Sequence, residues 1–170
     1  MTMVIRVYRY ARQHADRAEE LLQELIEIRN NLDEWATRTN AIYTDALANS
    51  FPYVPIVFMK GNNEANRYKM QMENKQNQVV LNLSLSLSFC AELICEMARE
   101  SSSEALGYKI RVRKIIDRII DIATNDAMSN APLGSLAPSI AKIESVITLN
   151  NAEHLRLMKI HLLNFRNKIS

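Results

Sequence analysis

The stretch NQVVLNLSLSLSFC, from Asn77 to Cys90, decides the fold prediction because its pattern differs from that of the rest of the chain. Between positions 81 and 89 every second residue is apolar, and Asn or Ser occupies the positions between them. Successive side chains of a β-strand point to opposite faces, so this period of two predicts a strand with one apolar and one polar face. Its apolar members are Leu81, Leu83, Leu85, Leu87 and Phe89.

The preceding segment supplies two candidate partner strands. Pro52 and Pro55 interrupt a helix, and VPIVFMK then forms a first extended piece that ends in GNNE around Gly61. NRYKMQME is a second piece, and NKQN is the next turn. The sequence therefore predicts a three-stranded antiparallel β-meander over residues 53–89. A helix over residues 63–78 is the alternative, because Met, Gln, Lys and Glu favour helix.

The N-terminal region predicts one long helix over residues 3–49. Residues 4–48 contain neither Gly nor Pro, and their apolar side chains recur in steps of three and four. Such a helix is about 65–70 Å long, whereas a compact domain of this chain length is about 40 Å across. We therefore expect the helix to overhang and to leave apolar surface for another copy. One seam contains Val4, Tyr8, Ala11, Ala15, Ala18 and Leu22, and a second runs from Leu21 through Leu25, Ile28, Leu32, Trp35, Thr39 and Ile42 to Ala46.

Helical periodicity returns after Phe89. Core helices are predicted within residues 90–130, where Ser101 and Glu104 have the spacing of a capping box. C-terminal helices are predicted within residues 135–169, and Pro138 suits a first helical turn. We expect a single domain over residues 1–170, mainly α, with the small β-meander inserted between the long helix and a C-terminal helical bundle (α+β by strict count).

Composition narrows the classes of function. The chain has 170 residues, with 21 Lys and Arg against 19 Asp and Glu, and a net charge of +2 does not favour a nucleic-acid partner. Cys90 and Cys95 predict reduced thiols in a cytoplasm-like compartment. No signal-peptide pattern and no run of about 18 apolar residues is present. We expect synthesis in the cytoplasm, and incorporation into a particle or release without a signal peptide stays open.

One catalytic pattern is present. Arg156 and His161, in RLMKIH, have the Arg-x4-His spacing and resemble the pair of the HEPN ribonucleases, a family of small helical domains. The resemblance implies action on RNA from facing helices of a dimer, with His161 in acid–base catalysis. This sequence departs from the family at Leu157, where a polar residue is usual, and the same spacing recurs at Arg9 and His14.

Metal and phosphate sites have no support in the sequence. His154 and His161 share a helical face without a third ligand, so no metal and no cofactor are expected. Only three glycines are present, which excludes a glycine-rich phosphate loop. A basic patch in YKIRVRKIIDR is a candidate contact for phosphate or an anionic membrane, and it comprises Lys109, Arg111, Arg113, Lys114 and Arg118.

These patterns favour a non-enzymatic structural protein that assembles with itself, as in a virion, phage tail or secretion apparatus, and other assembly proteins are further candidate partners. The first alternative is a pore-forming protein that inserts residues 79–89 into a membrane as an amphipathic strand. The second is a helical ribonuclease. The candidate oligomer interface comprises Val4, Tyr8, Ala11, Ala15, Ala18, Leu22, Leu81, Leu83, Leu85 and Leu87.

Overall fold

A computed structural model describes residues 2–48, 54–97, 100, 102–150 and 153–169, and it describes their side chains except at 2, 43, 46–47, 54–60, 148–150 and 153–158. These residues form helices and contain no β-strand. The prediction of a helical bundle is confirmed, and the prediction of a β-meander over residues 53–89 is wrong. The elements are α1 (Thr2–Ala48), α2 (Val54–Met97), α3 (Ser103–Ala123), two 3-10 turns η1 (Asp126–Met128) and η2 (Leu133–Leu136), α4 (Ala137–Asn150) and α5 (Glu153–Ile169).

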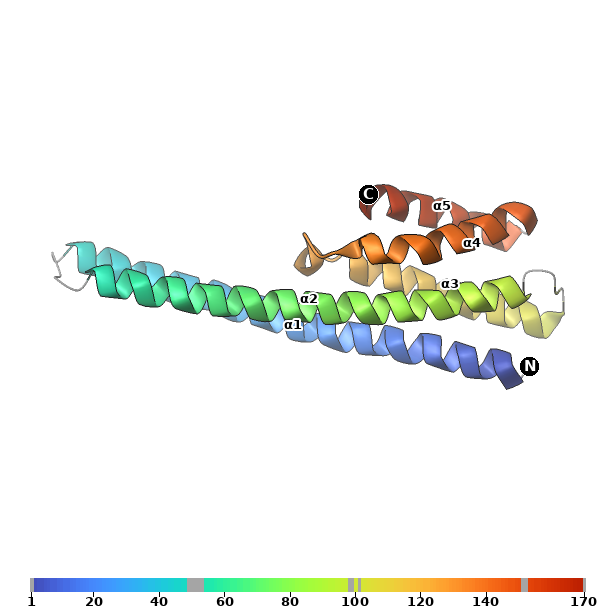
Figure 1. The fold of residues 1–170 in the computed structure, drawn as a ribbon, viewed down its shortest axis with the longest axis horizontal. Coiled ribbons are helices and arrows are strands. Elements are labelled where there is room, and N and C mark those ends of the chain that lie inside the picture. The colour runs from blue at the N-terminus through green and yellow to red at the C-terminus, as the bar shows by residue number, and fades with distance from the viewer. Residues whose placement is uncertain (1, 49–53, 98–99, 101, 151–152, 170) are drawn as a thin grey trace.

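The molecule is a long antiparallel hairpin of α1 and α2 with three shorter helices laid on one half of it (Figure 1). The shorter helices α3, α4 and α5 lie together along the half that contains the N-terminus, and the other half of the hairpin projects beyond them (Figure 1). The main core lies between these layers. Its fully buried members include Leu25, Leu83, Leu93, Ile116, Ile119, Leu136, Ile143 and Leu162.

The stretch that predicted a strand is the middle of α2. Successive residues of a helix are about 100° apart around the axis, so alternate leucines divide between two faces. Leu83 and Leu87 are buried, whereas Leu81 and Leu85 on the opposite face are 59% and 37% exposed. The serine between the buried leucines is buried as well, because the Ser86 hydroxyl donates a hydrogen bond of 2.6 Å to the carbonyl oxygen of Ala11.

The residues interpreted as turns also lie inside α2. Pro55 is the second residue of the helix, where the missing backbone N–H has no intrahelical partner to lose. Gly61 stands opposite α1, and a Cβ atom at this position would be 3.4 Å from Cγ2 of Thr39. That distance is an ordinary van der Waals contact, so the site has room for a Cβ atom, and Gly61 does not form a turn.

Small residues of α1 lie at the contact between the two helices in the inner half of the hairpin. Ala11, Ala15 and Ala18 are fully buried on α1, where side chains of this size allow the backbone of another helix to come near. The neighbouring helix is α2 of the same chain, as the hydrogen bond from Ser86 to Ala11 shows. In the hairpin, α2 of the same chain therefore covers the α1 surface that the sequence analysis predicted to contact another copy.

The outer half of the hairpin, here called the arm, comprises residues 26–48 of α1 and 54–75 of α2. Gln76 donates hydrogen bonds to the carbonyl oxygens of Ala127 and Ser129, which mark the end of the region covered by the shorter helices. Beyond it, Trp35 and Tyr68 pack across the hairpin with ring centroids 5.9 Å apart. No described side chain of the arm is fully buried. The predicted overhang therefore corresponds to a two-helix arm and not to a single helix.

The α3 helix begins one residue later than the capping box predicted. Ser102 is the N-cap, and its hydroxyl accepts a hydrogen bond of 3.2 Å from the backbone N–H of Ala105. Ser101 lies outside the described residues. At the other end of the bundle Pro138 occupies the first turn of α4, as its ring requires.

One segment of α2, Gly61–Met97, is long and apolar enough to cross a membrane by length and composition. Half of its most apolar window is buried against the other helices, and the core helix of a soluble protein satisfies the same criterion. Residues 79–89 are helical, so the amphipathic strand on which the pore alternative was based does not exist.

Candidate interaction surface

An aromatic and aliphatic strip lies along one side of the hairpin. The rings of Tyr10 and Phe89 pack with centroids 5.6 Å apart, and the His14 ring stacks on Phe89 at 5.9 Å with an interplanar angle of 10°. Leu85 is one turn from Phe89 and one turn from Leu81 on the same side of α2. Tyr10, Leu81 and Leu85 are exposed. The strip is therefore a continuous apolar surface that the described part of the chain leaves uncovered.

The strip faces away from the shorter helices. Tyr8 packs edge-on against Tyr108 of α3 with centroids 5.7 Å apart, and Tyr10 is about 200° further around α1. The side chains of Asp16 and Glu19 likewise contact α3 through Arg118. We call the uncovered side the open hairpin face. It comprises Arg6, Tyr10, Arg17, Glu20, Glu24 and Glu27 of α1 and Arg67, Met70, Leu81, Leu85, Phe89, Glu92 and Glu96 of α2.

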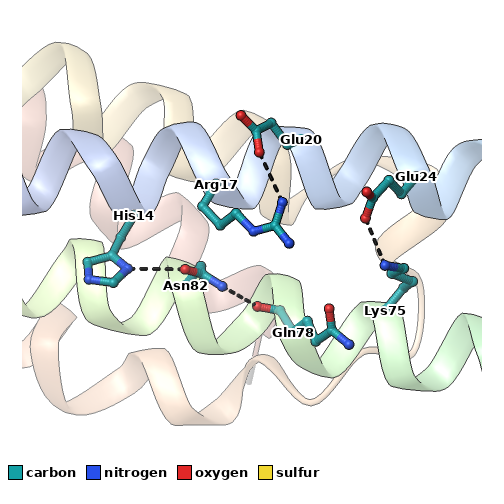
Figure 2. Close-up of polar contacts among 7 residues, drawn as sticks. All are labelled: His14, Arg17, Glu20, Glu24, Lys75, Gln78 and Asn82. Atoms are coloured by element: carbon teal, nitrogen blue, oxygen red, sulfur yellow. Dashed lines mark hydrogen bonds and ion pairs between the residues drawn. The ribbon is translucent and has the colours of Figure 1, made fainter.

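Polar contacts fix the register of the two helices on this face (Figure 2). His14 Nδ1 is 3.1 Å from Asn82 Oδ1, and the Asn82 amide also donates to the backbone carbonyl of Gln78 (Figure 2). Further along, Lys75 Nζ is 2.7 Å from a carboxylate oxygen of Glu24. Residue 14 therefore lies opposite residue 82, and residue 24 lies opposite residue 75.

Ion pairs within the chain compensate much of the charge on the open hairpin face. Arg17 Nη1 is 3.0 Å from a carboxylate oxygen of Glu20, one turn further along α1 (Figure 2). Glu24 of α1 pairs with Lys75 of α2. These four charges are therefore balanced within one molecule.

The ion pair of Glu24 gives a pH-dependent prediction. The hydrogen bond and the charge of Lys75 lower the pKa of Glu24 below its ordinary value. Because the folded-state pKa is below the unfolded-state value of about 4.3, the pair stabilises the fold above that pH and loses its effect as the pH falls through the lowered pKa. Replacing Lys75 with Met is expected to return the pKa of Glu24 to its ordinary value, as measured by NMR titration of the side-chain carboxyl. Lys69→Met is the control, and an unshifted Glu24 in the unmodified protein would contradict the contact.

The structure divides the predicted interface residues into two groups. Most of them lie in the core of the chain, where α2 and the shorter helices cover them: Val4, Ala11, Ala15, Ala18, Leu22, Leu83 and Leu87. Tyr8 is half-buried against Tyr108. Leu81 and Leu85 alone of this set lie on the open hairpin face.

The predicted basic patch does not form one cationic surface. Lys109 is buried, and its ammonium group donates a hydrogen bond of 2.6 Å to the carbonyl oxygen of Glu100. The Arg111 guanidinium lies over the Tyr108 ring at 5.2 Å, and Arg118 pairs with Asp16 at 2.5 Å and with Glu19. Arg113 and Lys114, half-buried and exposed respectively, complete the set. Arg111, Lys114 and Arg118 share one side of α3, where Asp16 and Glu19 compensate Arg118, whereas Lys109 and Arg113 lie on other sides of the helix.

The ribonuclease-like pair is only partly described. His161 is exposed on α5, and its Nδ1 is 2.8 Å from a carboxylate oxygen of Asp117 on α3. The side chain of Arg156 lies outside the described part, as does that of His154. The pairing of Arg156 with His161 therefore stays a prediction.

The two cysteines differ in their exposure to solvent. Cys90 is buried, and burial raises the pKa of its thiol despite an opposing hydrogen bond with Ser86, whereas Cys95 is exposed.

A pocket of about 390 Å³ lies between the end of α3 and the end of α5, and its polar lining includes Thr124, Asn125, Ser129, Asn130 and Lys168. Among the residues that the structure describes, no group of three or more metal-ligating side chains occurs.

The sequence interpretation missed the aromatic part of the strip. His14 and Phe89 are 75 positions apart and belong to segments that were predicted to be a helix and a strand. The sequence does contain a signal for a long helix here, because Asn62–Met97 contains neither Gly nor Pro. Such a helix would follow the N-terminal helix and could pack against it as an antiparallel hairpin.

The fold defines the class of the protein: an all-α molecule with a long helical hairpin that carries a layer of three shorter helices on one half. No known protein family, curated protein or solved structure matches the chain.

Proposed function

We propose that the protein is a non-enzymatic structural protein that assembles with copies of itself, as a building block of a larger particle or apparatus. The observation that supports this proposal is the arm. Its seam consists of half-buried side chains such as Leu32, Trp35 and Tyr68, and Ile42 and Met70 are 58% and 64% exposed. A hairpin with so little buried apolar surface gains stability from further packing, because isolated helices depend on tertiary contacts.

A protein partner also fits the overall charge. The chain has a net charge of +2, and so small a charge provides no strong attraction for a polyanion.

The test is the mass in solution, measured by light scattering from low to high micromolar concentration. A stable mass at or above twice the monomer value of 19.5 kDa is expected, and electron microscopy should then show discrete rings, tubes or filaments. A protein that stays monomeric over the whole range would remove the proposal.

A further inference from the structure

Helices α1 and α3 lie side by side and run in the same direction. Tyr8 of α1 packs against Tyr108 of α3, and further along both helices Asp16 of α1 pairs with Arg118 of α3 at 2.5 Å. Because the residue numbers rise together in these two contacts, the helices are parallel. Residues at equal distances before Asp16 and before Arg118 are therefore level with each other.

Four cations meet in this part of the two helices. On α1, Arg9 and Arg12 lie two turns and one turn before Asp16, on the same side of the helix. On α3, Arg111 and Lys114 lie two turns and one turn before the arginine that pairs with Asp16. All four side chains are exposed, and within the part of the chain that the structure describes none of them forms an ion pair. Two pairs of cations from neighbouring helices therefore share one face.

The acids nearby offset little of this charge. Asp16 and Glu19 both pair with Arg118, which is a fifth cation beside the other four. Glu104 and Asp121 lie on α3 at either end of the group, about 10 Å along the helix from the nearest of the four cations, which is about one Debye length at physiological ionic strength. The face is thus locally positive although the whole chain has a net charge of only +2.

Exposed isoleucines stand beside the cations on both helices. Ile5 is 41% exposed and lies one turn before Arg9, and Ile110 is 45% exposed and lies one turn before Lys114. The surface therefore combines cations with aliphatic side chains that reach into solvent. We call it the cationic face, and it comprises Ile5, Arg9 and Arg12 of α1 and Ile110, Arg111 and Lys114 of α3.

We propose that the cationic face binds the surface of a membrane that contains anionic lipids. In this contact the cations approach the charged headgroups, and the isoleucines reach the boundary between headgroups and acyl chains. The two parallel helices lie on the bilayer and do not cross it. The inference goes beyond the proposed self-assembly and does not depend on it, because it involves α1 and α3 near the N-terminus and not the arm.

The side chains between the cations favour lipid over nucleic acid. Proteins that bind single-stranded nucleic acid combine cations with exposed aromatic rings on which the bases stack. Here Tyr108 is 8% exposed and Tyr8 is half-buried, because their rings pack against each other and Arg111 Cζ lies 5.2 Å from the centroid of the Tyr108 ring. The large apolar side chains that remain exposed on this face are aliphatic, and these suit acyl chains.

Co-sedimentation with vesicles tests the proposal. The full chain is expected to sediment with vesicles of phosphatidylcholine and phosphatidylserine, and to stay in solution with vesicles of phosphatidylcholine alone. Binding should be lost at an ionic strength of about 1 M, where the Debye length is about 3 Å. Absence of binding to the anionic vesicles at low ionic strength would overturn the proposal.

Removal of the α1 cations locates the contact. A cation near an anionic bilayer strengthens binding roughly fivefold, so the double variant Arg9→Gln with Arg12→Gln is expected to weaken binding about 25-fold. The control is Arg38→Gln with Lys69→Gln, which removes the same charge from exposed positions of the arm and should leave the affinity unchanged. Equal weakening by both double variants would show a response to net charge alone and would overturn the assignment to this face. Circular dichroism verifies that each variant is folded.

Replacement of the isoleucines tests the orientation on the bilayer. Ile5→Asn and Ile110→Asn are each expected to weaken binding about fivefold, because each side chain no longer leaves water for the interface. Ile160→Asn, at a 52% exposed position of α5, is the control and should bind as the unmodified protein does. Unchanged binding in both isoleucine variants of the cationic face would overturn the proposed orientation.

Further outcomes separate this inference from its alternatives. Binding to a single-stranded oligonucleotide that depends on Arg9 and Arg12, without binding to anionic vesicles, would assign the cations to a nucleic acid and overturn the proposal. A protein that assembles but does not bind vesicles overturns this inference alone. A protein that binds vesicles and stays monomeric in solution supports this inference and overturns the proposed self-assembly alone.

Discussion

Replacing Leu83 with Ala is expected to lower the free energy of unfolding by about 3 kcal/mol, whereas replacing Leu85 with Ala lowers it by less than about 1 kcal/mol. The two leucines are two positions apart in LSLSLS and would be equivalent on a strand. In α2 they lie on opposite sides of the helix. Leu83 is fully buried in the core, so its truncation leaves a cavity, whereas Leu85 is 37% exposed and its site remains open to solvent.

Urea denaturation followed by circular dichroism measures this difference. It is performed at the lowest practical protein concentration, so that association contributes little to either variant. Leu87→Ala and Leu81→Ala form a second pair with the same expected order, because Leu87 is buried and Leu81 is exposed. Equal losses within both pairs would contradict the helical register of residues 81–87.

Replacing Phe165 with Ala is expected to lower the free energy of unfolding by about 3–5 kcal/mol. Phe165 is 1% exposed and is the largest side chain that α5 contributes to the core. The helix is also joined to α4 by an ion pair of 2.6 Å between Glu144 and Arg166, and the arginine side chain of this pair is 45% exposed. Loss of the buried Phe165 ring removes a large part of the apolar contact between α5 and the core.

Thermal denaturation of this variant should show a single transition at a lower temperature, because α5 shares the main core with α3 and α4. Asn164→Ala, at the exposed neighbouring position, is the control and should leave the transition unchanged. Separate early melting of α5, with the remaining helices intact, would contradict a shared core.

The helical part of the fold was predictable because its signals are local. The absence of Gly and Pro from residues 4–48 corresponds to an uninterrupted α1, and the isoleucines of residues 115–122 mark the buried side of α3. Pro138 stands in the first turn of α4 as expected. In each of these segments propensity, periodicity and capping residues favour the same structure.

The β-meander was predicted because α2 is buried on an unusually wide arc. It packs against α1, α3 and α4 at once, so its buried positions include Val79, Leu83, Cys90 and Leu93 at heptad spacing but also Val80 and Leu87. Ser86 belongs to the same heptad series. The series is hard to recognise in the sequence, because a serine at position 86 suggests a side chain that faces solvent. Its hydrogen bond to Ala11 depends on a segment 75 residues away, which no local pattern reveals.

The same long-range pairing limited the prediction of the surface. Alanines at 11, 15 and 18 indicate a close helix contact, and the sequence does not specify whether the partner helix belongs to the same chain or to another copy. The structure places α2 of the same chain against them. Leu81 and Leu85 remain on the outside, because none of the helices that the structure describes covers them.

The order of synthesis affects the folding of α1, because this helix packs antiparallel to α2, which is made after it. Ala11 meets Ser86 only after 75 further residues have been made, which takes roughly 4 to 15 seconds on a ribosome. During that interval the alanine and leucine face of α1 has left the exit tunnel without its partner. Nascent chains on one messenger, each with the same bare helix, are therefore exposed to premature pairing with one another, and a chaperone that shields the first thirty residues would raise the yield of correctly folded hairpins.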